Sequence, residues 1–517
     1  MSHSIHIAYG SESGNAKNIA LQLKDKLLAY QPVLSPLNDI VITELTSQDI
    51  LLIISSSFGD GEPPGNASKF FDTIYDYDGQ IDCQFAIFGL GDVSYPKFCG
   101  FTIDIDEKLQ QLKATSIGKR VDADTCYQDF FEQWSNALTL YFEGDSSALK
   151  QLDLQVKAYN EQQNYIAPIE TVKRINQSEF PVYDIHINIA GSGMNYQAGD
   201  LLYLMPPANK NSITRINTFY KDLSDTQKLL LSEKELRQLN KPLIRAVAKH
   251  TKNKALKALT KMSAAKTLAD YSYGRDVADL LTDYCTPENM PFEALLDILS
   301  TQLPRAYSIA SCGKQSPNRV RLCVREVQYQ REGYDYFGSG SYFLCHALDN
   351  TQSEVTAKVY VRSNAHFHLP NKSSTPIIMI GAGTGIAPYL GFLAQKRLGE
   401  THLFFGERHH DKDFLYQTEL KKCVEDGRLT ALYTAFSRDQ VEKIYVQDTL
   451  LQQGAVVWRL LENKAEIYVC GSKTNLSKPI DNALMMIAKK HGDLNDDEAK
   501  TFIEDLVKEQ RYHQDLY

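Results

Sequence analysis

A buried strand that runs directly into a glycine-rich turn and then a helix constrains this chain more than any other stretch. Residues 376–396 read PIIMIGAGTGIAPYLGFLAQK, and residues 377–380 have the length and β-branched content of a buried strand. Glycine lets the backbone approach an anion closely, and a helix start presents unpaired N–H groups. Gly381, Gly383, Thr384, Gly385 and Pro388 therefore predict a phosphate-binding turn, although a glycine-rich turn without a ligand stays open. The spacing G-x-G-T-G-x-x-P differs from the dinucleotide fingerprint G-x-G-x-x-G, so any nicotinamide site here is of a different kind.

Three loops near the start of the chain also follow short apolar strands, which we expect at residues 5–9, 50–54 and 85–88. Strands that alternate with helices predict a doubly wound parallel sheet, whose ligand lies at the carboxyl ends of the strands. The first loop offers hydroxyl and amide groups at a helix start, which suits a phosphate monoester. Phe58 and Tyr95 add aromatic rings, so we expect a flat heteroaromatic ligand, although Tyr95 taken singly also fits a core or surface aromatic.

The three loops resemble the FMN-binding loops of the flavodoxin-like domain in diflavin reductases, above all in the run FGLGDVSYPKFC. The resemblance implies that the first loop holds the FMN phosphate, that the other two flank the isoalloxazine ring, and that Tyr95 stacks on it. The residues implied are Ser11, Glu12, Ser13, Gly14, Asn15, Ala16, Ser56, Ser57, Phe58, Gly59, Leu90, Gly91, Asp92, Val93, Ser94, Tyr95, Pro96, Lys97, Phe98 and Cys99.

Charge and cysteine content narrow the function classes. The 517 residues suit two to four domains. Residues 1–150 contain 10 Lys and Arg against 21 Asp and Glu, so the net charge of -9 lies in the first third. An acidic domain repels nucleic acid and would steer a basic protein partner, although acidity that serves only solubility is an equal alternative. Nine scattered cysteines without metal-ligand spacing, and no long apolar run, predict a reduced cytoplasmic protein without a metal site or a membrane anchor.

The middle of the chain changes pattern twice. We expect a flavodoxin-like domain at residues 1–145, a polar linker at 146–164, and β-barrel strands at 165–207 and 301–368. A helical block at 208–300 interrupts the barrel, and an α/β nucleotide-binding domain follows at 369–517. The linker predicts a hinge, although an ordinary surface connection has the same composition.

Two stretches within the barrel pattern suggest a dinucleotide. Arg305 could clamp a pyrophosphate, Tyr307 and Ser308 could face a ring system, and residues 338–341 offer a small-residue loop before a helix. The runs RAYSIAS and GSGSYFL resemble the FAD-binding signatures of the ferredoxin-reductase-like module of diflavin reductases. The FAD contacts that this resemblance implies are Arg305, Ala306, Tyr307, Ser308, Cys323, Val324, Arg325, Gly338, Ser339, Gly340 and Ser341. Arg325 is a departure from that resemblance, because relatives with a TVG-like sequence have Gly there.

The last third of the chain places cationic side chains close in sequence to an aromatic ring. Ser437, Arg438, Lys443 and Tyr445 suit the 2′-phosphate and adenine of NADPH, although a solvated charge cluster is an open alternative. The run FSRDQVEKIYVQDTL resembles the NADPH-selecting segment of diflavin reductases, especially that of the sulfite reductase flavoprotein alpha-component. This resemblance adds Ile444, Val446 and Gln447 to the NADPH contacts. It also implies that Ser308, Cys470 and Asp515 lie at the nicotinamide as catalytic residues and that Tyr517 covers the FAD ring.

Together these patterns predict an α/β multidomain oxidoreductase with FMN, FAD and NADPH as cofactors. The resemblance implies that electrons pass from NADPH through FAD and FMN to a haem protein, foremost the haem subunit of assimilatory sulfite reductase, docked on the acidic FMN domain. Three alternatives stay open: a soluble cytochrome-type reductase with another acceptor, a flavin carrier or docking protein without NADPH turnover, and a flavin-free interaction protein. We expect neither nucleic acid nor membrane as a partner.

Overall fold

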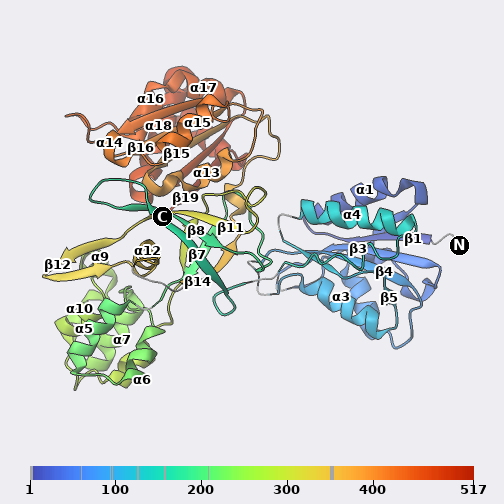
Figure 1. The fold of residues 1–517 in the computed structure, drawn as a ribbon, viewed down its shortest axis with the longest axis horizontal. Coiled ribbons are helices and arrows are strands. Elements are labelled where there is room, and N and C mark those ends of the chain that lie inside the picture. The colour runs from blue at the N-terminus through green and yellow to red at the C-terminus, as the bar shows by residue number, and fades with distance from the viewer. Residues whose placement is uncertain are drawn as a thin grey trace. The chain divides into compact units, whose positions relative to one another are not determined.

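The chain divides into two compact units, which are described separately (Figure 1). The computed structural model describes residues 4–59, 61–93, 95, 97–124, 127–156, 159–207, 209–349 and 354–517. The first unit comprises Met1–Asn160, Gly191–Gln197 and Val361–Ser363, and the second comprises Glu161–Ala190, Ala198–Tyr360 and Asn364–Tyr517. The domain borders expected from the sequence stay predictions.

A parallel sheet forms the centre of the first unit, with the strand order β2-β1-β3-β4 and with both β5 and β6 paired to β4. Its strands are β1 (Ser4–Gly10), β2 (Val33–Pro36), β3 (Asp49–Ser56), β4 (Gln84–Leu90), β5 (Thr115–Ser116) and β6 (Val121–Ala123). The central strand β3 is apolar almost throughout and buried from Ile50 to Ser55, because helices cover both faces of a doubly wound sheet. The predicted doubly wound sheet is confirmed.

Helices cover both faces of this sheet and create two cores. The helices are α1 (Asn15–Lys26), α2 (Ser68–Asp76), α3 (Gly100–Gln111) and α4 (Gln128–Phe142), with 3-10 turns η1 (Leu28–Tyr30), η2 (Leu37–Asp39) and η3 (Ile42–Glu44). Figure 1 shows α1 and α4 on one face and α3 on the other. Trp134 of α4 packs on Phe88 with ring centroids 5.2 Å apart. Leu149 and Leu154 belong to the same core, so the start of the expected linker packs on this unit; its hinge role stays a prediction.

An antiparallel β-barrel begins the second unit, with the strand order β10-β9-β14-β7-β8-β11. The strands are β7 (Tyr165–Arg174), β8 (Val182–Asn188), β9 (Leu201–Met205), β10 (Arg305–Ser308), β11 (Arg319–Arg325) and β14 (Thr356–Arg362). The two ends of this order meet, since Ile309 after β10 bridges Leu322 of β11 and the Ala310 N–H donates to the Arg321 carbonyl at 2.7 Å. Closure removes exposed strand edges. The barrel expected from the sequence is thereby confirmed.

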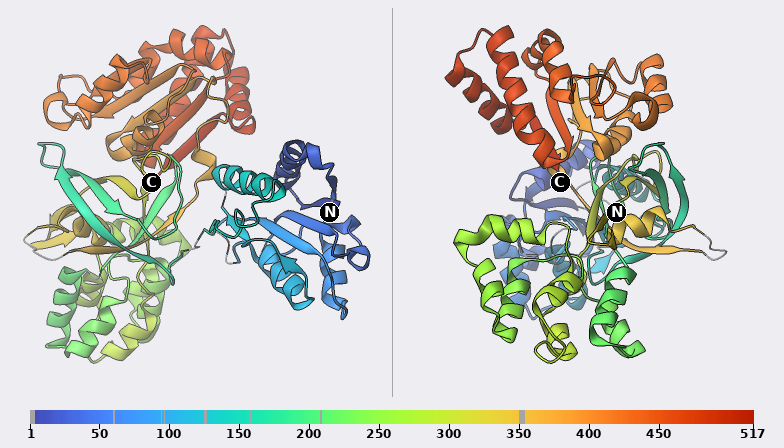
Figure 2. Two further views of the ribbon diagram at one scale, coloured as in Figure 1. Left: turned by 45° about the vertical axis from the view of Figure 1, so that its right-hand side comes forward. Right: turned by 90° about the vertical axis from the view of Figure 1, so that its left-hand side faces the viewer.

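A helical block stands between β9 and β10, as predicted, and Figures 1 and 2 show it as a cluster of its own. Its helices are α5 (Lys210–Tyr220), α6 (Asp225–Ser232), α7 (Lys241–Thr251), α8 (Lys254–Leu259), α9 (Ala265–Ser272), α10 (Val277–Tyr284) and α11 (Phe292–Ile298), with the 3-10 turn η4 (Met262–Ala264). Asparagine, serine or aspartate caps five of these seven starts (α5, α6, α7, α8 and α10) through a side-chain hydrogen bond. The block has its own apolar core.

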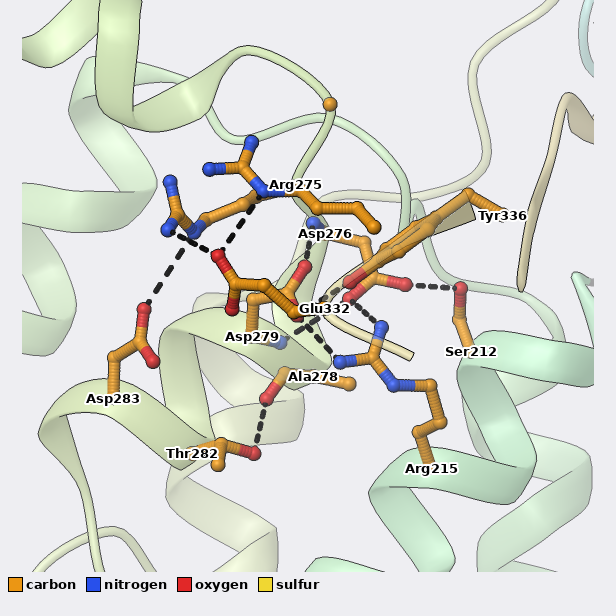
Figure 3. Close-up of polar contacts among 12 residues, drawn as sticks. Ser212, Arg215, Arg275, Asp276, Ala278, Asp279, Thr282, Asp283, Glu332 and Tyr336 are labelled. Atoms are coloured by element: carbon orange, nitrogen blue, oxygen red, sulfur yellow. Dashed lines mark hydrogen bonds and ion pairs between the residues drawn. The ribbon is translucent and has the colours of Figure 1, made fainter. Parts of the chain in front are cut away.

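A buried polar network joins this block to a hairpin that the sequence reading did not predict, β12 (Gln328–Arg331) and β13 (Tyr334–Phe337). Figure 3 shows Arg215 of α5 pointing to Asp276 and Asp279 at the start of α10, with Tyr336 of β13 alongside. The Arg215 Nη1 lies 3.1 Å from the Asp276 Oδ1, and Asp276 also accepts from the Ser212 hydroxyl at 2.7 Å. The Tyr336 hydroxyl donates to Asp279 at 2.7 Å. The hairpin is therefore anchored to the helical block by directional contacts.

Replacing Arg215 by methionine should lower the free energy of unfolding by about 3 kcal/mol, because Asp276 is 1% exposed and would lose its closest cation. Urea denaturation followed by circular dichroism measures the change. The matched control is Lys228→Met, which removes an exposed pair with Asp225 at 4.0 Å and should cost less than about 0.5 kcal/mol. Equal losses in the two variants would contradict the anchoring role.

The second parallel sheet has the order β17-β16-β15-β18-β19. Its strands are β15 (Ile377–Ala382), β16 (Thr401–Glu407), β17 (Ala431–Phe436), β18 (Glu466–Gly471) and β19 (Tyr512–Leu516). The remaining helices of the unit are α12 (Ser339–Cys345), α13 (Ala387–Leu393), α14 (His410–Asp413), α15 (Gln417–Glu425), α16 (Val446–Gln452), α17 (Gly454–Glu462), α18 (Lys473–His491) and α19 (Asp496–Lys508), with 3-10 turns η5 (Ala365–Phe367) and η6 (Gly383–Ile386). Within the described ranges, no helix is both long and apolar enough to cross a membrane.

Arg321 of β11 connects the barrel to the C-terminal sheet. Its Nε donates to the Asp184 Oδ1 at 2.7 Å, and its two terminal nitrogens donate to the Glu419 carboxylate of α15 at 3.0 Å each. The Tyr416 hydroxyl also donates to Asp184 at 3.0 Å. A fork of fixed geometry that contacts two carboxylates restrains both angle and distance.

Acid should weaken this connection. Burial opposes ionisation of Asp184, but hydrogen bonds from His186 and Arg321 lower its pKa from the ordinary 3.8 to about 2. A depressed pKa contributes stability that is present above about pH 4 and is lost as the pH falls through about 2, here about 2 kcal/mol in total. Between about pH 6 and pH 3, Asp184→Asn should lose about 1 kcal/mol less stability than the unmodified chain, as measured by urea denaturation. The same loss in both would exclude Asp184 as the group that titrates.

Candidate functional site

The loop between β1 and α1 leaves the start of α1 without a side-chain cap. Gly14 has a φ of 89°, and an added Cβ would meet nothing within 4 Å. No side chain caps α1 there; instead the Gly14 N–H donates to the Ser11 hydroxyl at 3.0 Å. The Ser11 N–H donates to Asn66 at 2.8 Å, which fixes the loop from outside. The backbone N–H groups after Gly14 can therefore donate hydrogen bonds to an anion. Ser13, Asn15 and Ala16 belong to the same turn and first helical residues.

Two exposed rings stand on the neighbouring loops. Phe58 follows β3 and is 56% exposed, and Tyr95 follows β4 and is 54% exposed. Exposed aromatic rings offer apolar surface to a ligand or a partner. Since β3 and β4 are adjacent parallel strands, both loops leave the same edge of the sheet. The arrangement therefore provides rings beside an anion-binding turn.

The other predicted residues of these loops have mixed roles. The Glu12 carboxylate accepts from the Gly65 N–H at 3.0 Å, and the Ser57 hydroxyl accepts from the Phe101 N–H at 3.2 Å, so both support the loops internally. The Val93 N–H donates to Asp124 at 3.2 Å. Ser56, Gly59, Leu90, Gly91, Asp92, Lys97, Phe98 and Cys99 lie in the same loops or at their strand ends. Ser94 and Pro96 lie outside the described residues.

The second unit holds a cavity of about 1000 Å³. It joins the barrel residues of the FAD-like signatures to the loops of the C-terminal sheet. The predicted residues that line it are Arg305, Ala306, Tyr307, Ser308, Cys323, Val324, Arg325, Gly338, Ser339, Gly340, Ser341, Gly383, Thr384, Ser437, Arg438, Ile444, Tyr445, Val446, Gln447, Asp515 and Tyr517. Dinucleotide-sized ligands need a volume in this range. The structure thus gathers segments that are up to two hundred residues apart in the sequence.

Five predicted residues do not line the cavity. Gly381, Gly385 and Pro388 support its wall, Cys470 is fully buried behind Asp515, and Lys443 is exposed outside. Arg408 and Glu407, which the sequence reading did not select, do line it. Both lie at the carboxyl end of β16, and the rule that ligands bind at that edge was the signal available for finding them.

Three residues contact one another at the cavity, and two of them, Ser308 and Asp515, line it. The Ser308 hydroxyl donates to the Asp515 Oδ2 at 2.6 Å, and the Cys470 thiol donates to the same oxygen at 3.6 Å. Cys470 on β18 pairs in register with Asp515 on β19, so the sheet itself sets their contact. Burial raises the pKa of Asp515 against the effect of these two hydrogen bonds. The group of three residues expected at the nicotinamide is therefore assembled here, while its role stays a prediction.

Tyr517 forms part of the cavity wall, and the helical block holds two other wall residues in place. The Tyr517 hydroxyl lies 2.8 Å from the Thr384 hydroxyl, and the residue as a whole remains 63% exposed. Arg305 is held by the buried Glu235 of the helical block, with Nη2 and Oε2 2.7 Å apart, and by the Leu303 carbonyl. Asn209 at the start of α5 donates to the Phe337 carbonyl and to Ser339 at 2.9 and 3.4 Å. The insertion thus positions one side of the cavity.

Comparison with known proteins agrees with this architecture. Residues 7–134 match the flavodoxin family, and residues 379–478 match the oxidoreductase NAD-binding domain family. A flavodoxin module, a barrel and an NAD-binding module in one chain define a nicotinamide-linked flavoprotein oxidoreductase.

Within that class, the chain belongs to the family of the sulfite reductase (NADPH) flavoprotein alpha-components. It is 33% identical to the protein of that name from Photorhabdus laumondii, over 99% of this chain and 90% of the relative. The proteins from Serratia proteamaculans and Bacillus subtilis are 32% and 31% identical, over 99% and 100% of this chain and 90% of each relative.

Gly385 should tolerate no side chain. An added Cβ would lie 2.1 Å from the Cys470 carbonyl oxygen, a backbone atom of β18 that cannot yield without disturbing the Asp515 contact. Gly385→Ala should cost about 1–3 kcal/mol of stability, measured as a fall in the unfolding midpoint. The control is Gly406→Ala, whose nearest contact is a side-chain carbon of Val446 at 3.3 Å. A loss for Gly385→Ala no larger than for this control would refute the close packing.

Proposed function

We propose that this chain is a diflavin oxidoreductase that draws electrons from NADPH and delivers them to the haem subunit of a sulfite reductase. The observation that carries this function is the shared cavity of the second unit, where the residues of both dinucleotide signatures meet beside Ser308, Asp515 and Cys470. When bound, NADPH supplies a hydride, FAD accepts it as an electron pair, and FMN releases the electrons singly.

The first unit would hold FMN. The open amides after Gly14 suit its phosphate, and the exposed rings of Phe58 and Tyr95 suit its flat ring system. Side chains of Glu12 and Ser57 are engaged within the loops, so they would act by shaping the site and not by direct contact.

The cavity would hold FAD and the reacting end of NADPH. On the barrel side, residues 338–341 and Arg305 suit the FAD diphosphate, and Tyr307 its ring; Glu235 keeps the Arg305 fork in place. On the sheet side, Arg438 and Ser437 suit the 2′-phosphate, with Tyr445 at the adenine. Tyr517, anchored to Thr384, would cover the flavin ring and move when nicotinamide enters.

Ser308, Asp515 and Cys470 would orient the nicotinamide. The half-buried Asp515 carboxylate accepts from both neighbours and so fixes the direction of their hydroxyl and thiol groups. Such fixed polar groups would restrain the position of the nicotinamide ring.

The acceptor would dock on the acidic first unit, whose charge attracts a basic surface. A cytoplasmic location remains part of this proposal. The test has three parts. The flavins of one portion of the purified protein are released and quantified; NADPH is added anaerobically to a second, flavin-loaded portion; and that reduced protein is mixed with the sulfite reductase haem subunit or with cytochrome c. Three results support the proposal: equal amounts of FMN and FAD, loss of flavin absorbance when NADPH is added, and electron transfer that is faster to the haem subunit than to cytochrome c. Colourless protein or no bleaching would exclude it, and faster transfer to cytochrome c would favour a cytochrome-type reductase.

Nicotinamide preference should depend on Arg438 more than on Lys443, since only Arg438 lines the cavity. Arg438→Gln should weaken NADPH by about tenfold or more, because a charge-assisted contact to the 2′-phosphate is lost, and should leave NADH nearly unchanged. Lys443→Gln should cause a smaller loss. The ratio of kcat/KM for the two nicotinamides measures both effects. Equal losses with NADPH and NADH for Arg438→Gln would rule out the 2′-phosphate contact.

A further inference from the structure

Arg325 places a charge at the point where the barrel and the C-terminal sheet meet in the cavity. It is the last residue of β11, and its guanidinium pairs with Glu407, the last residue of β16. The side chain of Arg325 is 30% exposed, whereas that of Glu407 is 4% exposed. Both residues line the cavity, so a ligand there meets the guanidinium before it meets the carboxylate.

Glu407 holds one edge of the guanidinium and leaves the other edge available. One carboxylate oxygen accepts from the Arg325 Nη2, and the other accepts from the Arg408 backbone N–H at 3.0 Å. Burial raises the pKa of Glu407, and the Arg325 charge opposes that effect. An arginine has five N–H donors. Among the described residues, Glu407 is the one hydrogen-bond partner of this side chain.

The glycine turn lies directly against this guanidinium. Gly383 has a φ of 60°, and an added Cβ would lie 3.0 Å from the Arg325 Nη2 and 3.4 Å from the Glu407 Oε1. Neighbouring Thr384 lines the same cavity. The glycine turn, which suits an anion, thus lies beside the Arg325 guanidinium, which has unused N–H donors. Together they form one continuous wall of the cavity.

The other three arginines that line the cavity have other neighbours or lie on another loop. Arg305 is paired with Glu235, and the Arg408 guanidinium stacks 3.8 Å from the centre of the Phe180 ring. Arg438 lies on the loop after β17, where the 2′-phosphate is proposed. Arg325 therefore is the cation at the glycine turn.

We propose that the N–H groups of Arg325 that do not contact Glu407 donate hydrogen bonds to the diphosphate of the nicotinamide dinucleotide. Glu407 is the residue that positions the guanidinium. This inference rests on the proposed function. It assigns the Arg325 side chain to the nicotinamide dinucleotide and not to the FAD diphosphate, because it lies over Gly383 and not over residues 338–341.

The test compares two ligands of the flavin-loaded protein by isothermal titration calorimetry: NADP⁺, which contains the diphosphate, and 2′-AMP, which lacks it. Arg325→Gln should weaken NADP⁺ by about tenfold and 2′-AMP by less than about twofold. Arg325→Lys should recover part of the NADP⁺ affinity, since it keeps the charge but loses the fork. The control is Arg319→Gln, at the other end of β11, where the guanidinium pairs with Glu170 at 2.6 Å; it should change neither affinity.

Flavin content and unfolding midpoint are measured on each variant. Loss of FAD from Arg325→Gln, equal weakening of both ligands, or unchanged NADP⁺ affinity would overturn the assignment while leaving the proposed function intact. Failure of the unmodified protein to bind NADP⁺ would instead overturn the proposed function, and the inference with it.

Discussion

The contact of Arg321 with Asp184 and Glu419 is the constraint on which the second unit depends. Two hydrogen bonds of 3.0 Å tie Arg321 of β11 to Glu419 of α15, and a third of 2.7 Å ties it to Asp184 of β8 within the barrel. Apolar packing between the same elements would hold them together but would allow sliding, whereas a bidentate arginine defines one angle. The cavity needs that definition, because Ser308 comes from the barrel and Asp515 from the sheet, and their 2.6 Å contact tolerates little displacement. The contact therefore fixes the geometry of the unit in addition to its contribution to stability.

Much of the architecture was predictable from periodicity and loop chemistry. Apolar runs such as residues 50–54 and 377–380 can be buried only as inner strands of a covered sheet, and both are. The switch from alternation to helical spacing marked the insertion between β9 and β10. The hairpin β12–β13 was not predicted, because its residues QYQR and YDYF are polar and aromatic without a clear apolar face. The hairpin is held in place by contacts with Arg215, Arg237 and Asp279, which lie far from it in the sequence.

The site was predictable where ligand-facing residues follow strands, and less so where side chains pair across the fold. Arg438 and Lys443 look equivalent in sequence, yet of the two only Arg438 lines the cavity, and Lys443 is exposed. The Arg325–Glu407 and Arg305–Glu235 pairs join residues 82 and 70 positions apart. No local pattern indicates such partners, since either residue alone resembles a surface charge.

The helical insertion has a consequence for the order in which the barrel can form. Leu204 of β9 pairs with Arg305 of β10 across about one hundred residues of intervening chain. Closing a flexible loop of that length costs about 4 kcal/mol in chain entropy. Helices with capped starts and a core of their own make mainly local contacts, which form quickly. Once folded, such a block is a rigid spacer that presents the two strand ends side by side, and the barrel then closes as though its strands were near neighbours in sequence.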